Sequence, residues 1–239
     1  MNAISAALGI YSVSDAARLT GVPSRQIRGW LLGYGQRARK APAPPVLKRQ
    51  HEPRDGELAL GFLDLLEVDF LGRIVRAAER QGRSPSWRAI RTAAETARRV
   101  LSTEHPFAVR RIHTDGRRIF AEAQKETGDL ALYDLVGDNF AIYDVLVGTF
   151  IASVDYEGDT ARRWTPNTLY RRIVVDPSRA FGRPIEVTSG APADALFNAW
   201  RGEKGNAAKV AAYFGTDEVG VDEAVRFTLG VDSHMLLAA

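Results

Sequence analysis

The sequence contains no cysteine in 239 residues, which excludes disulfide bonds and thiolate metal sites. The four histidines, His51, His105, His113 and His234, have no spacing typical of metal ligands, so we expect neither a structural metal nor a cofactor. Runs of about 18 apolar residues are also absent, and the first residues lack the basic region and apolar stretch of a secretory signal. We therefore predict a cytoplasmic protein with no membrane segment.

Acidic residues are missing from one stretch near the N-terminus. None occurs between Asp15 and Glu52, whereas this window contains eight cations: Arg18, Arg25, Arg28, Arg37, Arg39, Lys40, Lys48 and Arg49. A group of cations without anions repels itself unless an anionic partner offsets the charge, which favours DNA as the partner. After Gly202 the chain is acidic on balance, which favours a basic partner protein there.

The cationic window begins with a pattern typical of a helix-turn-helix. Ser12 or Ser14 can cap a first helix, and Gly21-Val22-Pro23 ends it. Ser24 is expected to cap a second helix that ends at Gly33 and buries Ile27, Trp30 and Leu31. In such motifs the second helix presents its N-terminal residues to the major groove of DNA.

This pattern assigns roles to the polar residues of the motif. Arg25, Gln26 and Arg28 are the expected base readers, since arginine pairs with guanine and glutamine with adenine. Ser14, Ser24 and the backbone N–H groups of a helix start are expected to hold phosphates. Residues 33–53 are rich in glycine, proline and cations and predict a basic wing, with phosphate contacts from Arg37, Arg39, Lys40, Lys48 and Arg49. The alternative is two ordinary surface helices that share a basic face.

The middle of the chain predicts further helices and a hairpin. Apolar residues at helical spacing indicate helices over residues 62–78 and from Ser84-Pro85 to Leu101. Residues 109–113 and 119–123, which flank Asp115-Gly116, are expected to pair as a hairpin. Residues 140–154 fit either a helix or a buried strand, although the length favours a helix.

The last third of the chain predicts short strands and then helices. A strand is expected at residues 172–176, a turn and another short extended piece within residues 181–187, and three amphipathic helices follow them. The predicted fold class is mainly α with small β hairpins, with an N-terminal winged helix-turn-helix and a C-terminal homeodomain-like three-helix bundle.

A cluster of acidic residues raises the possibility of an enzyme. Clustered carboxylates can hold Mg²⁺ for phosphodiester cleavage. However, these aspartates fit no single helical face, and no Gly-rich phosphate loop or nucleophile elbow is present. We therefore expect no catalytic site. The cluster comprises Asp129, Asp134, Asp138, Asp144, Asp155 and Asp159.

Several segments resemble known families. The opening YSVSDAARLTGVPSRQIRGWLLGY resembles the winged helix-turn-helix of MerR-like regulators, with Gly33-Tyr34 at the start of the wing. RRIVVDPSRAFGRPIEVTSGAPADAL, Arg171 to Leu196, and the helices after it resemble the domain of unknown function DUF-four-three-three. The pieces FLDLLEVDFL, HPFA and TDGRRIF resemble those of long VapB-type antitoxins that join these two ends. This chain departs from the C-terminal domain at TSGAP, Thr188 to Pro192, where Gly-Thr-Arg-Ile-Pro is usual.

The resemblance implies a type II antitoxin. Such a protein neutralises a cognate toxin, here a PIN-like ribonuclease, and represses its own operon by binding double-stranded operator DNA. We expect a MerR-like DNA-binding domain with bracing helices over residues 1–103, a middle hairpin and helix for dimerisation over 104–165, and a C-terminal helical domain for toxin binding over 166–239. A homodimer is expected because one module contacts few base pairs. The alternative is a free-standing MerR-like transcriptional regulator that responds to a small effector.

Overall fold

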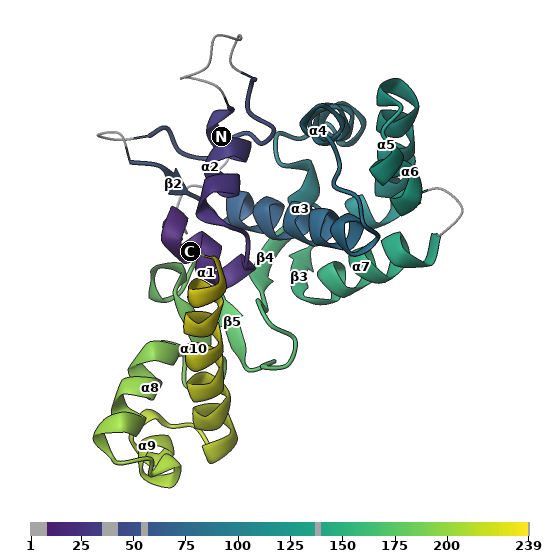
Figure 1. Ribbon diagram of the computed structural model, residues 1–239. Helices are drawn as coiled ribbons and strands as arrows, with labels where there is room; N and C mark the ends of the chain where they lie inside the picture. Colours follow the sequence, from purple (N-terminus) through teal and green to yellow (C-terminus); the bar gives the residue numbers. More distant parts are fainter. Residues whose placement is uncertain (1–8, 35–42, 54–56, 137–139, 239) are drawn as a thin grey trace, which may run out of the picture.

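The computed structural model of the protein describes residues 9–34, 43–53, 57–136 and 140–238. Within these ranges the chain is mainly helical and carries two small antiparallel sheets (Figure 1), as the sequence predicts. None of the helices in these ranges is both long and apolar enough to cross a lipid bilayer.

Two short helices open the described chain. Strand β1 (Tyr11–Ser12) leads into α1 (Val13–Thr20), and α2 (Ser24–Leu32) follows. Ser12 caps α1: its Oγ accepts the N–H of Asp15 at 3.0 Å, and the Asp15 carboxylate accepts the N–H of Ser12 at 3.2 Å. The predicted cap of α2 is wrong, because Pro23 is the N-cap and Ser24 lies inside the helix with no capping bond.

The chain after α2 folds back onto that helix. Gly33 ends α2 with a left-handed φ of +84°, and Tyr34 then forms an antiparallel bridge with Ala43. The N–H groups of Val46 and Leu47 both donate to the carbonyl of Trp30, at 2.8 and 3.0 Å. Strand β2 (Ala59–Leu60) pairs with β1 and brings the chain to the next helix.

A long helix, α3 (Phe62–Arg80), runs through the centre of the fold. Helix α4 (Trp87–Leu101) begins two residues later than predicted, because Ser86 rather than Ser84 caps it and accepts the N–H of Ala89 at 3.2 Å. The short 3₁₀ turn η1 (Pro106–Ala108) places the Phe107 ring on Phe70 of α3, with ring centroids 5.1 Å apart.

The hairpin predicted around Asp115-Gly116 is wrong, because this region is helix α5 (Ile112–Thr127). Its buried residues recur at helical spacing, and the helix packs on α4, α6 and α7. Gly116 lies inside the helix, where the Tyr143 hydroxyl would be 2.0 Å from a Cβ atom. The glycine therefore serves close packing against α7 rather than a turn.

Two further helices and a four-stranded sheet complete the middle of the chain. After α6 (Leu130–Val136), residues 140–154 mostly form helix α7 (Phe140–Ala152) rather than a strand. The sheet has the antiparallel order β3-β4-β5-β6. Its strands are β3 (Val154–Glu157), β4 (Thr160–Trp164), β5 (Ile173–Val175) and β6 (Pro184–Glu186), with the 3₁₀ turn η2 (Ala180–Gly182) before the last. The strand predicted at residues 172–176 is thus confirmed as β5, and the turn and extended piece predicted within residues 181–187 as η2 and β6.

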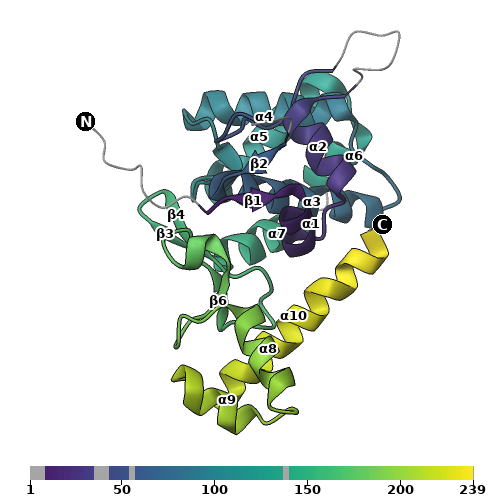
Figure 2. The same cartoon turned by 90° about the vertical axis from the view of Figure 1, so that its left-hand side faces the viewer.

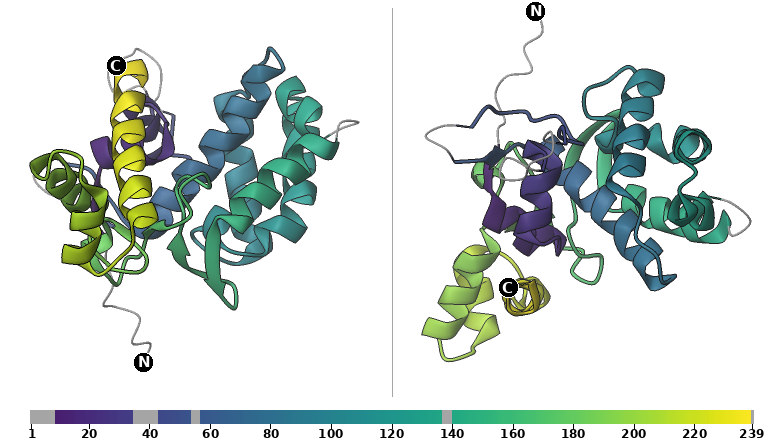
Figure 3. Two further views of the ribbon diagram at one scale, coloured as in Figure 1. Left: turned by 90° about the horizontal axis from the view of Figure 1, so that it is seen from below. Right: turned by 45° about the horizontal axis from the view of Figure 1, so that its top comes forward.

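Three helices close the chain: α8 (Ala193–Gly202), α9 (Ala207–Phe214) and α10 (Glu218–Ala238). Helix α10 packs on α8 and α9 and then reaches back to α1 (Figure 2), so the first and the last helix are in contact. The C-terminal helices lie on the opposite side of the molecule from α4, α5 and α6 (Figure 3).

Candidate nucleic-acid interface

Helix α2 has one buried side and one exposed cationic side. Ile27 and Trp30 are fully buried, whereas Arg25 and Arg28 are exposed. Neither arginine side chain has a hydrogen bond or an ion pair with any described residue, and Gln26 beside them is half-buried. Two guanidinium groups are therefore available to an anion on this side of α2.

The other predicted contact residues differ in position and pairing. Ser14 is exposed in the first turn of α1, and Ser24 is half-buried in that of α2. Lys48 pairs with Glu104 at 3.8 Å and Arg49 with Glu52 at 3.0 Å. The predicted wing residues Arg37, Arg39 and Lys40 lie outside the described residues.

Tyr34, predicted only as the start of the wing, packs against α2. The Tyr34 ring lies so close to α2 that a Cβ atom on Gly29 would be 2.1 Å from it. The same ring meets Trp87 of α4 edge-on, with centroids 4.6 Å apart. Tyr34 therefore fixes the base of the 35–42 segment between α2 and α4.

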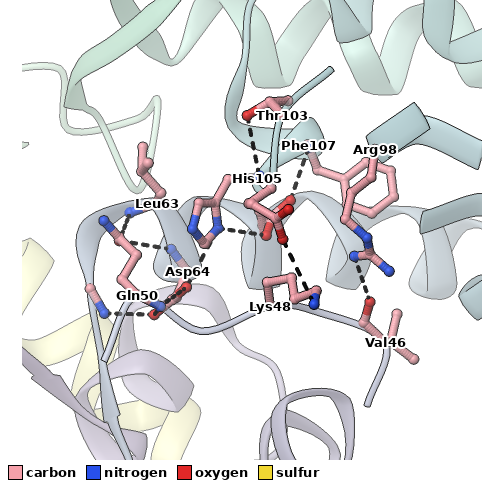
Figure 4. Close-up of polar contacts among 12 residues, drawn as sticks. Val46, Lys48, Gln50, Leu63, Asp64, Arg98, Thr103, His105 and Phe107 are labelled. Carbon is pink, nitrogen blue, oxygen red and sulfur yellow. Dashed lines mark hydrogen bonds and ion pairs between the residues drawn. The ribbon is translucent and has the colours of Figure 1, made fainter. Parts of the chain in front are cut away.

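A buried polar cluster holds residues 46–50, within the predicted wing, on α3 and α4 (Figure 4). The Gln50 side chain accepts the N–H of Leu63 at 2.7 Å, and the Asp64 carboxylate accepts the N–H groups of Gln50 and Gly61 at 3.1 and 2.9 Å. These bonds satisfy N–H groups at the start of α3 that have no partner within the helix. From α4, Arg98 donates to the carbonyl of Val46 at 3.0 Å.

His105 and Glu67 extend this cluster. Glu67 is fully buried, where it accepts the N–H of Phe107 at 3.0 Å and lies 3.2 Å from Nδ1 of His105. Burial raises the pKa of Glu67. Burial alone would lower the pKa of His105, but the bond to Glu67 and the charges of Glu67 and Asp64 outweigh it, so this pKa is raised. The pair is a structural link between α3 and η1.

The aspartates considered for Mg²⁺ do not converge. Asp134 pairs with Arg83 at 2.8 Å, Asp155 with Arg163 at 2.5 Å and Asp159 with Arg111 at 2.7 Å. Asp129 caps a helix by accepting the N–H of Leu132, Asp144 is exposed on α7, and Asp138 lies outside the described residues. Within the described ranges, no group of three or more histidine and acidic side chains could hold a metal ion.

Comparisons with known proteins find a distant relative by sequence and a solved protein of similar fold. No protein-family model matches the chain. It is 22% identical over 193 residues, 76% of this chain and 78% of the other, to "Putative antitoxin VapB45" of Mycobacterium tuberculosis (strain ATCC 25618 / H37Rv). The crystal structure of Rv2018 from Mycobacterium tuberculosis has a similar fold, with a TM-score of 0.68 and 18% identity, covering 90% of this chain and 96% of that one. The chain therefore shares the fold of a solved protein and has a distant relative that is named as an antitoxin.

Proposed function

We propose that this protein is the DNA-binding antitoxin of a type II toxin–antitoxin system and represses its own operon. The arginines on the exposed side of α2, which have no side-chain partner among the described residues, are the observation that supports DNA binding most directly. The similarity to a protein named as an antitoxin supports the rest of the assignment.

In this proposal α1 and α2 form a winged helix-turn-helix of the MerR type. Helix α2 lies in the major groove, and Arg25, Gln26 and Arg28 contact base edges. Residues 33–53, whose described part includes the Tyr34–Ala43 bridge, act as the wing. Lys48 and Arg49 exchange their surface carboxylates for phosphates at a small cost, because exposed ion pairs contribute only about 0–1 kcal/mol. Two copies bind as a homodimer on two half-sites.

The toxin, which we propose is a PIN-like ribonuclease, binds the outer face of α9 and α10. This face exposes the apolar side chains of Tyr213 and Val219, which are 61% and 57% accessible to solvent. Glu218 and Asp222 are exposed nearby along α10. Lys209 also lies over the Tyr213 ring, 5.7 Å from its centroid, and pairs with Glu203. Exposed apolar side chains with carboxylates nearby suit a partner that offers apolar and basic side chains.

DNA binding is tested with the operon's own promoter across a salt series. Arg25→Ala and Arg28→Ala are each expected to weaken specific binding by about 5- to 150-fold, the equivalent of about 1–3 kcal/mol for a base contact. Arg88→Ala removes an exposed arginine from α4 and serves as the control. Wild-type affinity in both α2 variants would contradict the proposal.

Toxin binding is tested by co-expression with the adjacent toxin-sized reading frame and copurification. Tyr213→Ala and Val219→Ala are expected to reduce the copurified toxin. Val145→Ala on α7 is the control, because Val145 is equally exposed at 63% but lies elsewhere. Equal loss in all three variants would refute the placement of the toxin on α9 and α10.

The second candidate is a free-standing regulator that responds to a small effector. A cavity lined by arginines of α1 and α3 supports the binding of an effector. It favours this regulator over an antitoxin that binds no small molecule.

A further inference from the structure

A cavity of about 500 Å³ opens beside the contact between α1 and α10. The end of α1, the second half of α3, the β4–β5 connection and Phe227 of α10 line it. Figure 1 shows α10 beside α1, with α3 extending away from them. The volume lies within the range of about 300–1,000 Å³ that is usual for small-molecule sites.

Arginines dominate the charged lining of this cavity. Arg73, Arg76 and Arg80 occur three and four residues apart on α3, so they lie on the same side of that helix, and Arg18 of α1 faces them. Only one carboxylate, that of Asp69, is among the described lining residues. It is nearly fully buried and is bonded to Nε of Arg73 at 2.8 Å.

Arg76 is the least satisfied member of this group. It is half-buried and forms no hydrogen bond or ion pair with the described residues. Burial lowers the pKa of Arg76; Asp69 raises it, whereas Arg73 and Arg80 lower it further. An arginine stays protonated under such conditions, so the cost of burying its charge beside like charges remains until an anion offsets it.

Neutral donors lie across the cavity from these arginines. Asn167 and Thr168, in the β4–β5 connection, both line it. The Asn167 Oδ1 already accepts the N–H of Leu169 at 2.9 Å, which leaves the amide N–H groups of Asn167 as donors. Guanidinium, amide and hydroxyl donors around one hollow are the groups that bind oxyanions.

We propose that this cavity binds a small molecule through a phosphate-type oxyanion that carries two or more negative charges. Arg76 and Arg80 contact the anion directly, Arg73 is held in place by Asp69, and Asn167 and Thr168 bind from the opposite wall. This binding does not depend on the proposed antitoxin function, because no residue of the exposed side of α2 takes part.

The test is calorimetric titration of the full-length protein with sodium pyrophosphate. Wild type is expected to bind one equivalent, and Arg76→Gln and Arg80→Gln are each expected to lower the affinity by about tenfold or more, as the loss of a charge-assisted bond requires. Arg88→Gln carries the same charge change on α4 and should bind like wild type. Thermal unfolding of each variant without ligand shows that the fold is retained.

Two arms identify the source of the phosphate. Binding of pyrophosphate to the DNA-bound protein supports a free small molecule. Displacement of pyrophosphate by arbitrary duplex DNA, together with weaker DNA binding by Arg76→Gln, assigns the oxyanion to the DNA backbone instead. Absence of pyrophosphate binding at millimolar concentration, or equal binding by wild type and Arg76→Gln, would overturn the proposal whatever the result for promoter DNA.

Discussion

Two glycines inside helices should respond to the same substitution with opposite signs. Gly116 in α5 and Gly148 in α7 both lie within helices, where alanine is favoured by about 1 kcal/mol. A Cβ atom on Gly148 meets no atom within 4 Å, whereas one on Gly116 would be 2.0 Å from the Tyr143 hydroxyl oxygen. Gly148→Ala should therefore stabilise the protein by about 1 kcal/mol.

Gly116→Ala combines the same helical gain with a steric penalty. Forcing extra volume into a packed site costs about 1–3 kcal/mol, so the expected net loss is about 0–2 kcal/mol. The clash comes from one atom: after the hydroxyl oxygen, the nearest atoms to the Cβ are Cδ1 of Ile112 and Cζ of Tyr143, at 3.2 and 3.3 Å. Removal of that oxygen should therefore relieve most of the penalty.

Tyr143→Phe supplies this relief and completes a double-mutant cycle. The Tyr143 hydroxyl is buried without a hydrogen-bond partner among the described residues, so its loss should be neutral or stabilising. In the Tyr143→Phe background, Gly116→Ala should gain up to about 1 kcal/mol, which gives a coupling free energy of about 1–2 kcal/mol. Urea unfolding at equal m-values measures all four variants. Additive effects of the two substitutions would refute the close packing of α5 on α7.

Two further predictions concern the Glu67–His105 pair and the glycine that ends α2. Folding raises the pKa of Glu67 and of His105 above the ordinary values of 4.5 and 6.5, so their contribution to stability is present below those values and is lost as pH rises through the folded pKa values. The free energy of unfolding should therefore fall above about pH 6.5, and Glu67→Gln should flatten this decline in urea titrations; an unchanged slope in the variant would contradict the assignment. Gly33→Ala should destabilise the protein more than Gly82→Ala. Both glycines have left-handed φ values, +84° and +81°, so the backbone strain is similar. Among the described residues, however, only a Cβ atom on Gly33 would meet a neighbour, the Ala43 carbonyl oxygen at 2.2 Å. Equal losses would show that backbone strain alone determines the effect.

Periodicity in the sequence predicted the helices with long apolar faces, but it could not explain why a glycine stands at position 116. The pattern of α3 and the buried side of α2 were correct because both depend on spacing within one element. Asp115-Gly116 has the composition of a hairpin turn, and the reason for this glycine, the ring of Tyr143, lies in another helix. A local rule cannot distinguish a glycine needed for a turn from one needed for close packing.

The buried polar cluster was missed for a similar reason. His105, Glu67 and Gln50 come from three segments, and the bonds that join these segments link residues more than ten positions apart. The sequence offered no ligand spacing and no helical register that relates them. Only the docking of segment 46–52 and of η1 on α3 brings them together.

The charge pattern of the N-terminal window was informative, but it overstated the number of available cations. Anions from outside the window, or at its edge, pair with Lys48 and Arg49, namely Glu104 and Glu52. Arg25 and Arg28 have no such partner among the described residues. The salt dependence of DNA binding reports the net number of phosphates neutralised, with a slope of about −0.9 for each phosphate. A cation that exchanges a carboxylate for a phosphate is paired both before and after binding. The slope should therefore be smaller than the value that eight newly paired cations would give. The loss of affinity in alanine variants should be largest for residues of α2.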